Sequence, residues 1–156
     1  MKKCCIVGHR TIEIDQSLID KIRKELIKMI EDENIYIFLF GSQSMFTTLC
    51  YDIISQLKQS YKQLCRVFIR AEYPIISSEY ESYLKTFYEE TYFYNKHLIT
   101  GKLSYIKRDQ VLIDKSDICL FFYNKHYTAP KNTRSGTELA YQYAVKKKKN
   151  IINVYG

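Results

Sequence analysis

The chain has 156 residues, of which 46% are hydrophobic and 26% charged, with five glycines and two prolines. This length and composition are typical of one globular domain and exclude a disordered chain. No stretch approaches the run of about 18 apolar residues that a membrane helix needs, and Met1-Lys2-Lys3 leads directly into a strand-like segment instead of a signal peptide. We therefore expect a cytoplasmic protein with no membrane partner.

The net charge of +7 makes nucleic acid the first partner to consider. The densest basic run, Lys146 to Lys149, falls at the end of an expected helix, where lysines complement the helix dipole and face solvent. We expect that role for the run, while a general preference for anionic ligands stays open. Nucleic acid is therefore a less favoured partner than a small anionic ligand.

The cysteines are five in number, and no two of them form a C-x-x-C pair. Most lie in apolar strand-like runs, where free cysteine packs as a small hydrophobic residue. This pattern argues against disulfides and against a zinc site. We expect reduced thiols in the core and no bound metal.

Apolar runs alternate with amphipathic stretches along the whole chain. The apolar runs predict strands at 3–7, 35–40, 64–69, 91–94, 116–123 and 150–154. The amphipathic stretches predict helices at 16–32, 44–58, 79–90, 103–115 and from 135 onward. Asp15 or Ser17 is the start signal of the first helix, and Ser78-x-x-Glu81 is a capping box for the third.

This order of elements predicts an α/β fold. We expect a single Rossmann-like domain over 1–156, with a doubly wound, mainly parallel sheet of about five strands and helices on both faces. Ligands of such sheets bind beyond the carboxyl ends of the strands, where the loops 8–10, 41–44 and 124–137 should meet. Walker A, G-x-G-x-x-G, H-E-x-x-H and nucleophile-elbow motifs do not occur in the sequence, which disfavours standard kinases, dehydrogenases and proteases.

The first two loops carry residues suited to a ligand. Gly8 and Gly41 favour sharp turns at strand ends, where a positive φ is often needed. Arg10 offers a planar, permanently charged guanidinium for a phosphate or carboxylate. His9 is expected to contact either the ligand or another loop, and Ser42 to lie near the sugar of a bound nucleoside.

The third loop leads into a helix at Ser135-Gly136-Thr137. Amides at a helix start attract anions, so we expect these amides and Arg10 to bind phosphate across one shared hollow. Glu138 has two interpretations. It forms a capping box, S-x-x-E, with Ser135, or it attacks or stabilises the anomeric carbon of a ribosyl group. The capping role is favoured.

Tyrosine is concentrated in the middle of the chain, with seven tyrosines between positions 73 and 105. They could form a stacking wall for a base, but we expect most of them to be half-buried packing residues. Their abundance also offers material for a homodimer interface.

Three motifs together resemble a known superfamily. They are Cys4-Cys5-Ile6-Val7-Gly8-His9-Arg10, Tyr105-x-x-Arg108-Asp109-Gln110-Val111-Leu112-Ile113-Asp114-x-Ser116-Asp117 and Ser135-Gly136-Thr137-x-x-Ala140-Tyr141-x-Tyr143-Ala144. In this order they resemble the YpsA-like branch of the SLOG superfamily, Rossmann-like proteins related to the LOG phosphoribohydrolases and to the DNA-processing protein DprA. The resemblance implies a pocket for a nucleotide or a nucleotide-derived, ADP-ribose-like ligand. Leu139 and Ala140 stand where LOG enzymes carry glutamates, so it does not imply the LOG reaction.

The residues and the resemblance give one expected function and two alternatives. We expect a binding or sensor domain for a small phosphorylated, nucleotide-like ligand, with no cofactor. The alternatives are an N-glycosidic-bond hydrolase or transferase acting on nucleoside phosphates, with Glu138 as catalytic residue, and a nucleic-acid-binding module. Arg108 and Asp117 enter the ligand site through the resemblance. The candidate ligand-binding residues are Gly8, His9, Arg10, Gly41, Ser42, Arg108, Asp117, Arg134, Ser135, Gly136 and Thr137.

Overall fold

A computed structural model describes residues 1–95, 101–127 and 135–156 of the chain. Its strands form one sheet in the order β4-β3-β2-β1-β5-β6, and all neighbouring strands are parallel. The predicted α/β class is confirmed, with six strands where about five were expected. The strands are β1 (Lys3–Gly8), β2 (Ile37–Phe40), β3 (Cys65–Arg70), β4 (Glu90–Phe93), β5 (Ile118–Phe122) and β6 (Asn150–Asn153).

In the described part of the chain, five helices connect these strands, and their side-chain caps set where several of them begin. They are α1 (Gln16–Glu33), α2 (Met45–Leu57), α3 (Ser78–Lys85), α4 (Lys102–Asp114) and α5 (Gly136–Lys146). The Asp15 carboxylate accepts a hydrogen bond from the Leu18 amide at 2.8 Å and so starts α1, as predicted. The cap of α3 is Ser77, whose hydroxyl accepts from the Tyr80 amide at 3.1 Å, and not the predicted Ser78.

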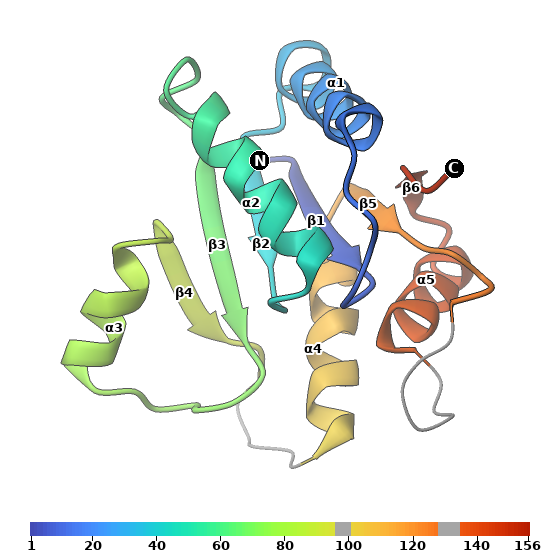
Figure 1. Ribbon diagram of the computed structural model, residues 1–156. Coiled ribbons are helices and arrows are strands. Elements are labelled where there is room, and N and C mark those ends of the chain that lie inside the picture. Colours follow the sequence, from blue (N-terminus) through green and yellow to red (C-terminus); the bar gives the residue numbers. More distant parts are fainter. Residues whose placement is uncertain (96–100, 128–134) are drawn as a thin grey trace.

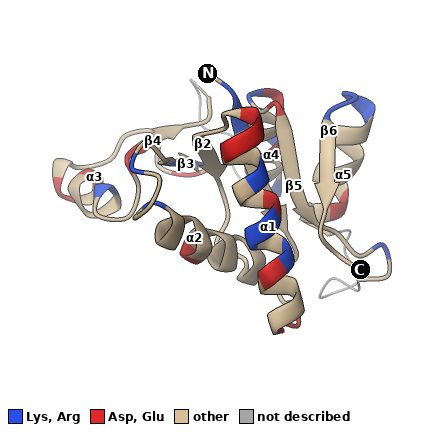
Figure 2. Ribbon diagram, turned by 90° about the horizontal axis from the view of Figure 1, so that it is seen from above, with Lys and Arg blue, Asp and Glu red and all other residues tan. Residues whose placement is uncertain are grey.

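The strand order explains which helices cover which face of the sheet. From β1 the chain steps through β2 and β3 to β4 in one direction, and right-handed crossovers place α1 and α2 on one face. α4 then returns the chain to β5 on the other side of β1, so α4 and α5 cover the opposite face (Figure 2). α3 stands at the outer edge of the molecule beside β4 (Figure 1).

Alternate residues of the central strand β1 face two separate cores. Cys4 and Ile6 pack with the buried residues of α1 and α2, whereas Cys5 and Val7 pack with those of α4 and α5. A strand that is buried on both faces has a continuous apolar sequence, because neither side of its pleat meets water. This is why β1 and β5 were predictable from their sequences.

The cysteines belong to these cores. All five thiols are free, and four of them are buried while Cys65 is half-buried. Burial raises the pKa of the Cys4 and Cys50 thiols well above the usual value, so both stay protonated at neutral pH. Among the described helices, none combines the length and the hydropathy needed to cross a bilayer.

An ion pair joins β3 to the turn that precedes β4. Arg66 Nη2 lies 2.7 Å from Glu89 Oε2, and Arg66 Nε donates to Glu89 Oε1 at 3.0 Å. The Arg66 guanidinium also lies 5.3 Å from the centre of the Tyr51 ring. Burial by itself raises the pKa of Glu89, but the hydrogen bonds and the charge of Arg66 outweigh it and hold the pKa below its usual value.

We expect Glu89→Gln to lower the free energy of unfolding by about 1 to 2 kcal/mol at neutral pH. Because Glu89 is more acidic in the folded chain than in the unfolded chain, the unfolded chain binds more protons in acid. The contribution of the Glu89 carboxylate to the free energy of unfolding is therefore complete above about pH 4.3, and it is lost as the pH falls through the lower pKa of the folded chain. Urea unfolding at neutral pH and at pH values below that range measures both effects.

The exposed neighbour Glu90 provides the matched control, since Glu90→Gln removes the same charge without breaking the ion pair. A stability difference between wild type and Glu89→Gln that does not shrink in acid would contradict this account of the pair.

Candidate functional site

The order of strands reverses between β1 and β5, at the centre of the sheet. These two strands pair in register up to Gly8 and Phe122, so the loops that follow them leave the sheet side by side at its carboxyl edge. In doubly wound sheets this switch point is where ligands bind. The candidate site is therefore built from the β1–α1 loop, the β5–α5 loop and the neighbouring β2–α2 loop.

Gly8 and Gly41 are needed for close packing and not for a turn. Neither has a positive φ, so the expected turn requirement is wrong at both positions. A Cβ on Gly8 would collide with the Phe46 ring of α2, and a Cβ on Gly41 would lie 2.6 Å from Arg108 Cδ. The two glycines thus let α2 and α4 approach the ends of β1 and β2.

His9 joins the two central loops. Its side chain is 1% exposed, its ring stacks on Tyr127 with a centroid distance of 3.9 Å, and its Nε2 accepts the Asn124 amide at 2.8 Å. Since Nε2 offers its lone pair, the ring proton is on Nδ1, which lies 3.4 Å from the Ser135 hydroxyl and donates to it. Burial lowers the pKa of His9, which fits a neutral ring. This tautomer cannot take a proton from Ser135, so His9 connects loops and is not a base for a serine nucleophile.

Ser135 is the cap of α5, as the capping-box motif predicted. Its Oγ accepts the Thr137 amide at 3.1 Å and the Glu138 amide at 3.4 Å. The Thr137 amide, which was expected to bind phosphate, therefore already donates its hydrogen bond to the Ser135 hydroxyl. Arg134 lies outside the described residues, so its predicted role stays a prediction.

Arg10 borders a hollow near this edge, called the larger hollow because it exceeds a second one between α4 and α5. The hollow has a volume of about 500 Å³ and lies between the β1–α1 loop and the start of α2. The Arg10 carbonyl accepts the Met45 amide at 2.9 Å, which holds the loop against the first turn of α2 while the side chain stays exposed. The lining residues are Arg10, Thr11, Ile14, Gln43, Met45, Thr48, Leu49 and Asp52.

Gly136 borders a different hollow of about 220 Å³ between α4 and α5, together with Asp109 and Lys146. We expected Arg10 and the Gly136 turn to share one hollow, and in the described residues they border different ones. The reason is that the two hollows lie on opposite faces of the sheet, one beside α2 and the other between α4 and α5. Ser42 is half-buried and lines neither hollow, and its carbonyl accepts the Thr47 hydroxyl at 3.1 Å.

Arg108 is buried inside the protein. From α4 it donates Nη1 to the Gly41 carbonyl and Nε to Asp109 at 3.0 Å, and its guanidinium lies 5.6 Å from the centre of the Tyr105 ring. Burial raises the pKa of Asp109 although the charge of Arg108 lowers it. Arg108 therefore holds the β2–α2 loop through the Gly41 carbonyl, and it lines neither of the two hollows.

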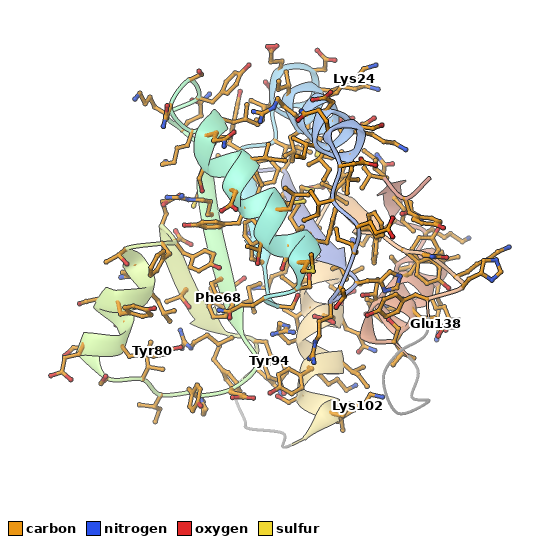
Figure 3. All side chains as sticks on the ribbon, viewed as in Figure 1. Lys24, Phe68, Tyr80, Tyr94, Lys102 and Glu138 are labelled. Carbon is orange, nitrogen blue, oxygen red and sulfur yellow. The ribbon has the colours of Figure 1, made fainter. Side chains whose placement is uncertain are left out.

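Asp117 and Glu138 lie away from the larger hollow. Asp117 precedes β5 at the amino edge of the sheet, where its carboxylate accepts the Lys3 amide at 2.9 Å, so it is not brought to the ligand edge. Glu138 is half-buried on the first turn of α5, and the Gln142 amide lies 3.5 Å from its Oε1 (Figure 3). Neither of the two hollows is lined by Glu138.

The structure adds residues that the sequence analysis did not single out. Tyr127 and Asn124 hold His9, and Asp52 provides a carboxylate on the far wall of the larger hollow. Asp52 follows Thr48 by four residues in a helix that begins at the carboxyl edge, which puts both side chains on one face. That spacing was a usable signal for the Asp52 position.

The tyrosine-rich segment has two parts. Tyr94 is buried and Tyr88 stacks on Phe68 with a centroid distance of 5.1 Å, so these two have the expected packing role. Four of the seven tyrosines are exposed, so the expectation that most of them are half-buried packing residues is wrong. Tyr73, Tyr80 and Tyr83 are exposed at the outer edge around α3, and none of them lines the hollow beside Arg10.

Comparison with known proteins gives a likeness of fold. No family model matches the sequence, and no curated protein matches it. Among solved structures, the chain is similar to the X-ray structure of TM1055, a structural genomics target, with a TM-score of 0.56 and 16% sequence identity over 97% of this chain and 72% of that chain. At this identity the likeness concerns architecture alone, and it agrees with the observed sheet: the chain has a Rossmann-like α/β fold.

Proposed function

We propose that this protein binds a small phosphorylated, nucleotide-derived ligand in the hollow beside Arg10. The observation that carries the proposal is this hollow of about 500 Å³ at the carboxyl edge of the sheet, next to the point where the strand order reverses. Its volume is in the range of small-molecule sites, roughly 300 to 1,000 Å³.

The lining of the hollow suits the parts of a nucleotide. Arg10 offers a guanidinium for a phosphate, and Asp52 offers a carboxylate that can accept hydrogen bonds from ribose hydroxyls. Ile14 and Met45, which are 43% and 39% exposed, offer apolar surface for a base. A charged end, an acceptor and an apolar wall in one hollow favour a ligand with a charged group, hydroxyls and a flat apolar ring.

The surroundings of Arg10 favour a preformed site. The Arg10 carbonyl is bonded to Met45 of α2, and the preceding residue, His9, is buried and bonded to the β5–α5 loop. The backbone of the loop is therefore fixed on both sides before a ligand arrives, which reduces the entropy lost on binding. Since Glu138 borders neither hollow, the proposal is binding and not cleavage of a glycosidic bond.

The charge distribution favours a small ligand over nucleic acid. Basic and acidic residues are interspersed along α1 in Figure 2, so this helix offers no continuous basic stripe. In the basic run, Lys146 to Lys148 are exposed, and Lys149 donates to the Ser116 carbonyl at 3.0 Å. The solvent-facing role predicted for the run therefore holds at Lys146 to Lys148, whereas Lys149 is half-buried.

A thermal-shift panel of nucleoside monophosphates and diphosphates, cyclic nucleotides and ADP-ribose tests the proposal. A ligand at a hundredfold excess over its Kd stabilises the folded state by about 2.7 kcal/mol, which raises Tm by several degrees in a chain of this size. We expect Arg10→Ala to weaken binding at least about tenfold, because it removes the charged partner of the phosphate.

Lys24→Ala is the matched control, since Lys24 is an exposed cation on α1 far from the carboxyl edge (Figure 3). Asp52→Asn should weaken the binding of a nucleotide but leave the binding of inorganic phosphate unchanged. Equal affinity of a ligand for the wild type and for Arg10→Ala would show that the ligand binds at another site. Steeply salt-dependent binding of DNA, with no response to any nucleotide, would favour the nucleic-acid alternative.

A further inference from the structure

The outer edge of the molecule carries a cluster of exposed aromatic and apolar side chains. Of the twelve large hydrophobic side chains that are exposed in the described residues, five lie between positions 73 and 87. Their exposures are 59%, 91%, 37%, 58% and 43% for Tyr73, Ile75, Tyr80, Tyr83 and Phe87. We name these five residues the α3 aromatic face.

The rings of the α3 aromatic face form one continuous row. Tyr73 lies 6.3 Å from Tyr80, Tyr80 lies 6.2 Å from Tyr83, and Tyr83 lies 5.4 Å from Phe87, measured between ring centres. A contiguous apolar surface of a few hundred Å² is about as large as the largest patch on a typical monomer, and such a patch is often a functional site. The row is therefore a candidate interface, because its rings are contiguous and are not isolated exposed residues.

The fold directs this row outward. Within α3, all of which the structure describes, Leu84 is the one buried residue. Tyr88, just after the helix, stacks on Phe68 of β3, so α3 is attached through these two residues while Tyr80 and Tyr83 face away. α3 projects beyond β4 at one end of the molecule, clear of α1, α4 and α5, where a partner can reach it (Figures 1 and 2).

The charges along α3 decide between kinds of partner. Glu79 and Glu81 lie in its first turn and Lys85 in its last turn. Two carboxylates beside the tyrosines repel the phosphates of a nucleic-acid strand, although aromatic side chains can stack on bases. Glu81 and Lys85 form an ion pair within one helix, at 3.1 Å. A second copy of α3 packed antiparallel places the exposed Glu79 in the first turn of one helix opposite Lys85 in the last turn of the other, so that a carboxylate faces an ammonium group and the helix dipoles oppose each other.

We infer that the α3 aromatic face is a homodimer interface with two-fold symmetry. In this arrangement Tyr83 packs on its symmetry mate and Tyr80 packs on Phe87 of the other copy, since a two-fold contact pairs a surface with itself. The exposed parts of the five side chains amount to roughly 500 Å² per copy, given about 150 to 250 Å² for each aromatic side chain. This is less than the roughly 800 Å² per partner of a standard interface, so the dimer dissociates on dilution.

Sedimentation velocity over a wide range of protein concentrations tests the inference. The wild type should pass from monomer to dimer as concentration rises, and Tyr83→Ser should weaken dimerisation roughly tenfold or more, because tyrosine at the centre of an interface carries much of its energy. Val145→Ser on α5 is the control: Val145 is 54% exposed, a degree similar to Tyr83, and should leave dimerisation unchanged. Equal Tm values for the three proteins exclude unfolding as the cause.

A charge swap tests the antiparallel arrangement separately. Lys85→Glu should weaken the dimer, and adding Glu79→Lys to it should restore most of the affinity, because the reversed charges then face each other between the two copies. Positions 79 and 85 are six residues apart and do not pair within one helix, so this rescue reports on contacts between copies. The inference is overturned if the wild type stays monomeric at the highest concentration, if Tyr83→Ser dimerises like the wild type, or if the swapped variant is no tighter than Lys85→Glu. Tyr83-dependent binding of single-stranded DNA by a protein that stays monomeric would overturn it in favour of a nucleic-acid surface.

Discussion

Replacing Arg108 by methionine will destabilise the fold by about 3 kcal/mol or more. Arg108 is 5% exposed and is bonded to the Asp109 carboxylate and to the Gly41 carbonyl. The methionine side chain fills much of the same space but donates no hydrogen bond, so a largely buried carboxylate and a carbonyl lose their partner. Leaving such groups unpaired costs more than the pair contributes.

Chemical denaturation of Arg108→Met measures this loss, with Lys107→Met as control, because Lys107 is an exposed cation on the same helix. The double variant Arg108→Met/Asp109→Asn should recover part of the stability, since it removes the unpaired charge. A double variant no more stable than Arg108→Met alone would show that the ion pair is not the source of the effect.

The pH dependence of Arg108→Met has the opposite sign to that of the Arg66–Glu89 pair. Burial already raises the pKa of Asp109, and loss of the Arg108 charge raises it further. The folded variant then holds a proton that the unfolded chain releases above about pH 3.9. Its stability is therefore highest in mild acid and falls as the pH rises through the folded pKa, so the deficit against wild type grows toward neutral pH.

The second large effect is expected for Phe46→Ala, which should cost about 3 to 5 kcal/mol. Phe46 is fully buried in the first turn of α2, against Gly8 and 5.7 Å from the centre of the Phe122 ring. Its removal leaves a cavity at the point where α2 meets the ends of β1 and β5. Met45→Ala on the same turn is the control, because Met45 is largely outside the core.

Gly8→Ala provides a test of the contact itself. Alone it should cost about 1 to 3 kcal/mol, because its Cβ collides with the Phe46 ring. In the Phe46→Ala background the same Cβ enters the cavity, so the double variant should be more stable than the sum of the two losses predicts. Strict additivity of the two changes would mean that Gly8 is required for some other reason.

The sequence was sufficient for the elements whose signals are local. The apolar run of β1, the Asp15 cap of α1 and the Ser135 cap of α5 each depend on residues a few positions apart. α3 was harder, because the competing cap Ser77 stands next to Ser78 and because the helix ends at Lys85, where the chain turns to bring Glu89 to Arg66. That contact joins residues 23 positions apart, which local patterns do not report.

The candidate site was predictable only in outline. The loops that carry His9 and Ser135 were expected to meet, since both follow strands at the centre of a doubly wound sheet. The separation of Arg10 and Gly136 into different hollows was not predictable, because it depends on how α2 packs on the β1–α1 loop and how α5 packs on α4, which are contacts between residues far apart in the chain. Similarly, the buried role of Arg108 depends on its contact with Gly41, 67 positions away in the chain.

The position of β1 in the middle of the sheet has a consequence for how the chain folds. Its partners β2 and β5 are made at very different times, and the bond between Lys3 and Asp117 closes a loop of 114 residues. Forming that loop early is entropically costly, so the half that contains β2, β3 and β4 can assemble first. At that stage the edge of β1 that later pairs with β5 has no partner strand. During synthesis the unpaired side of β1 is a strand edge open to other nascent chains, and the arrival of β5 ends that exposure.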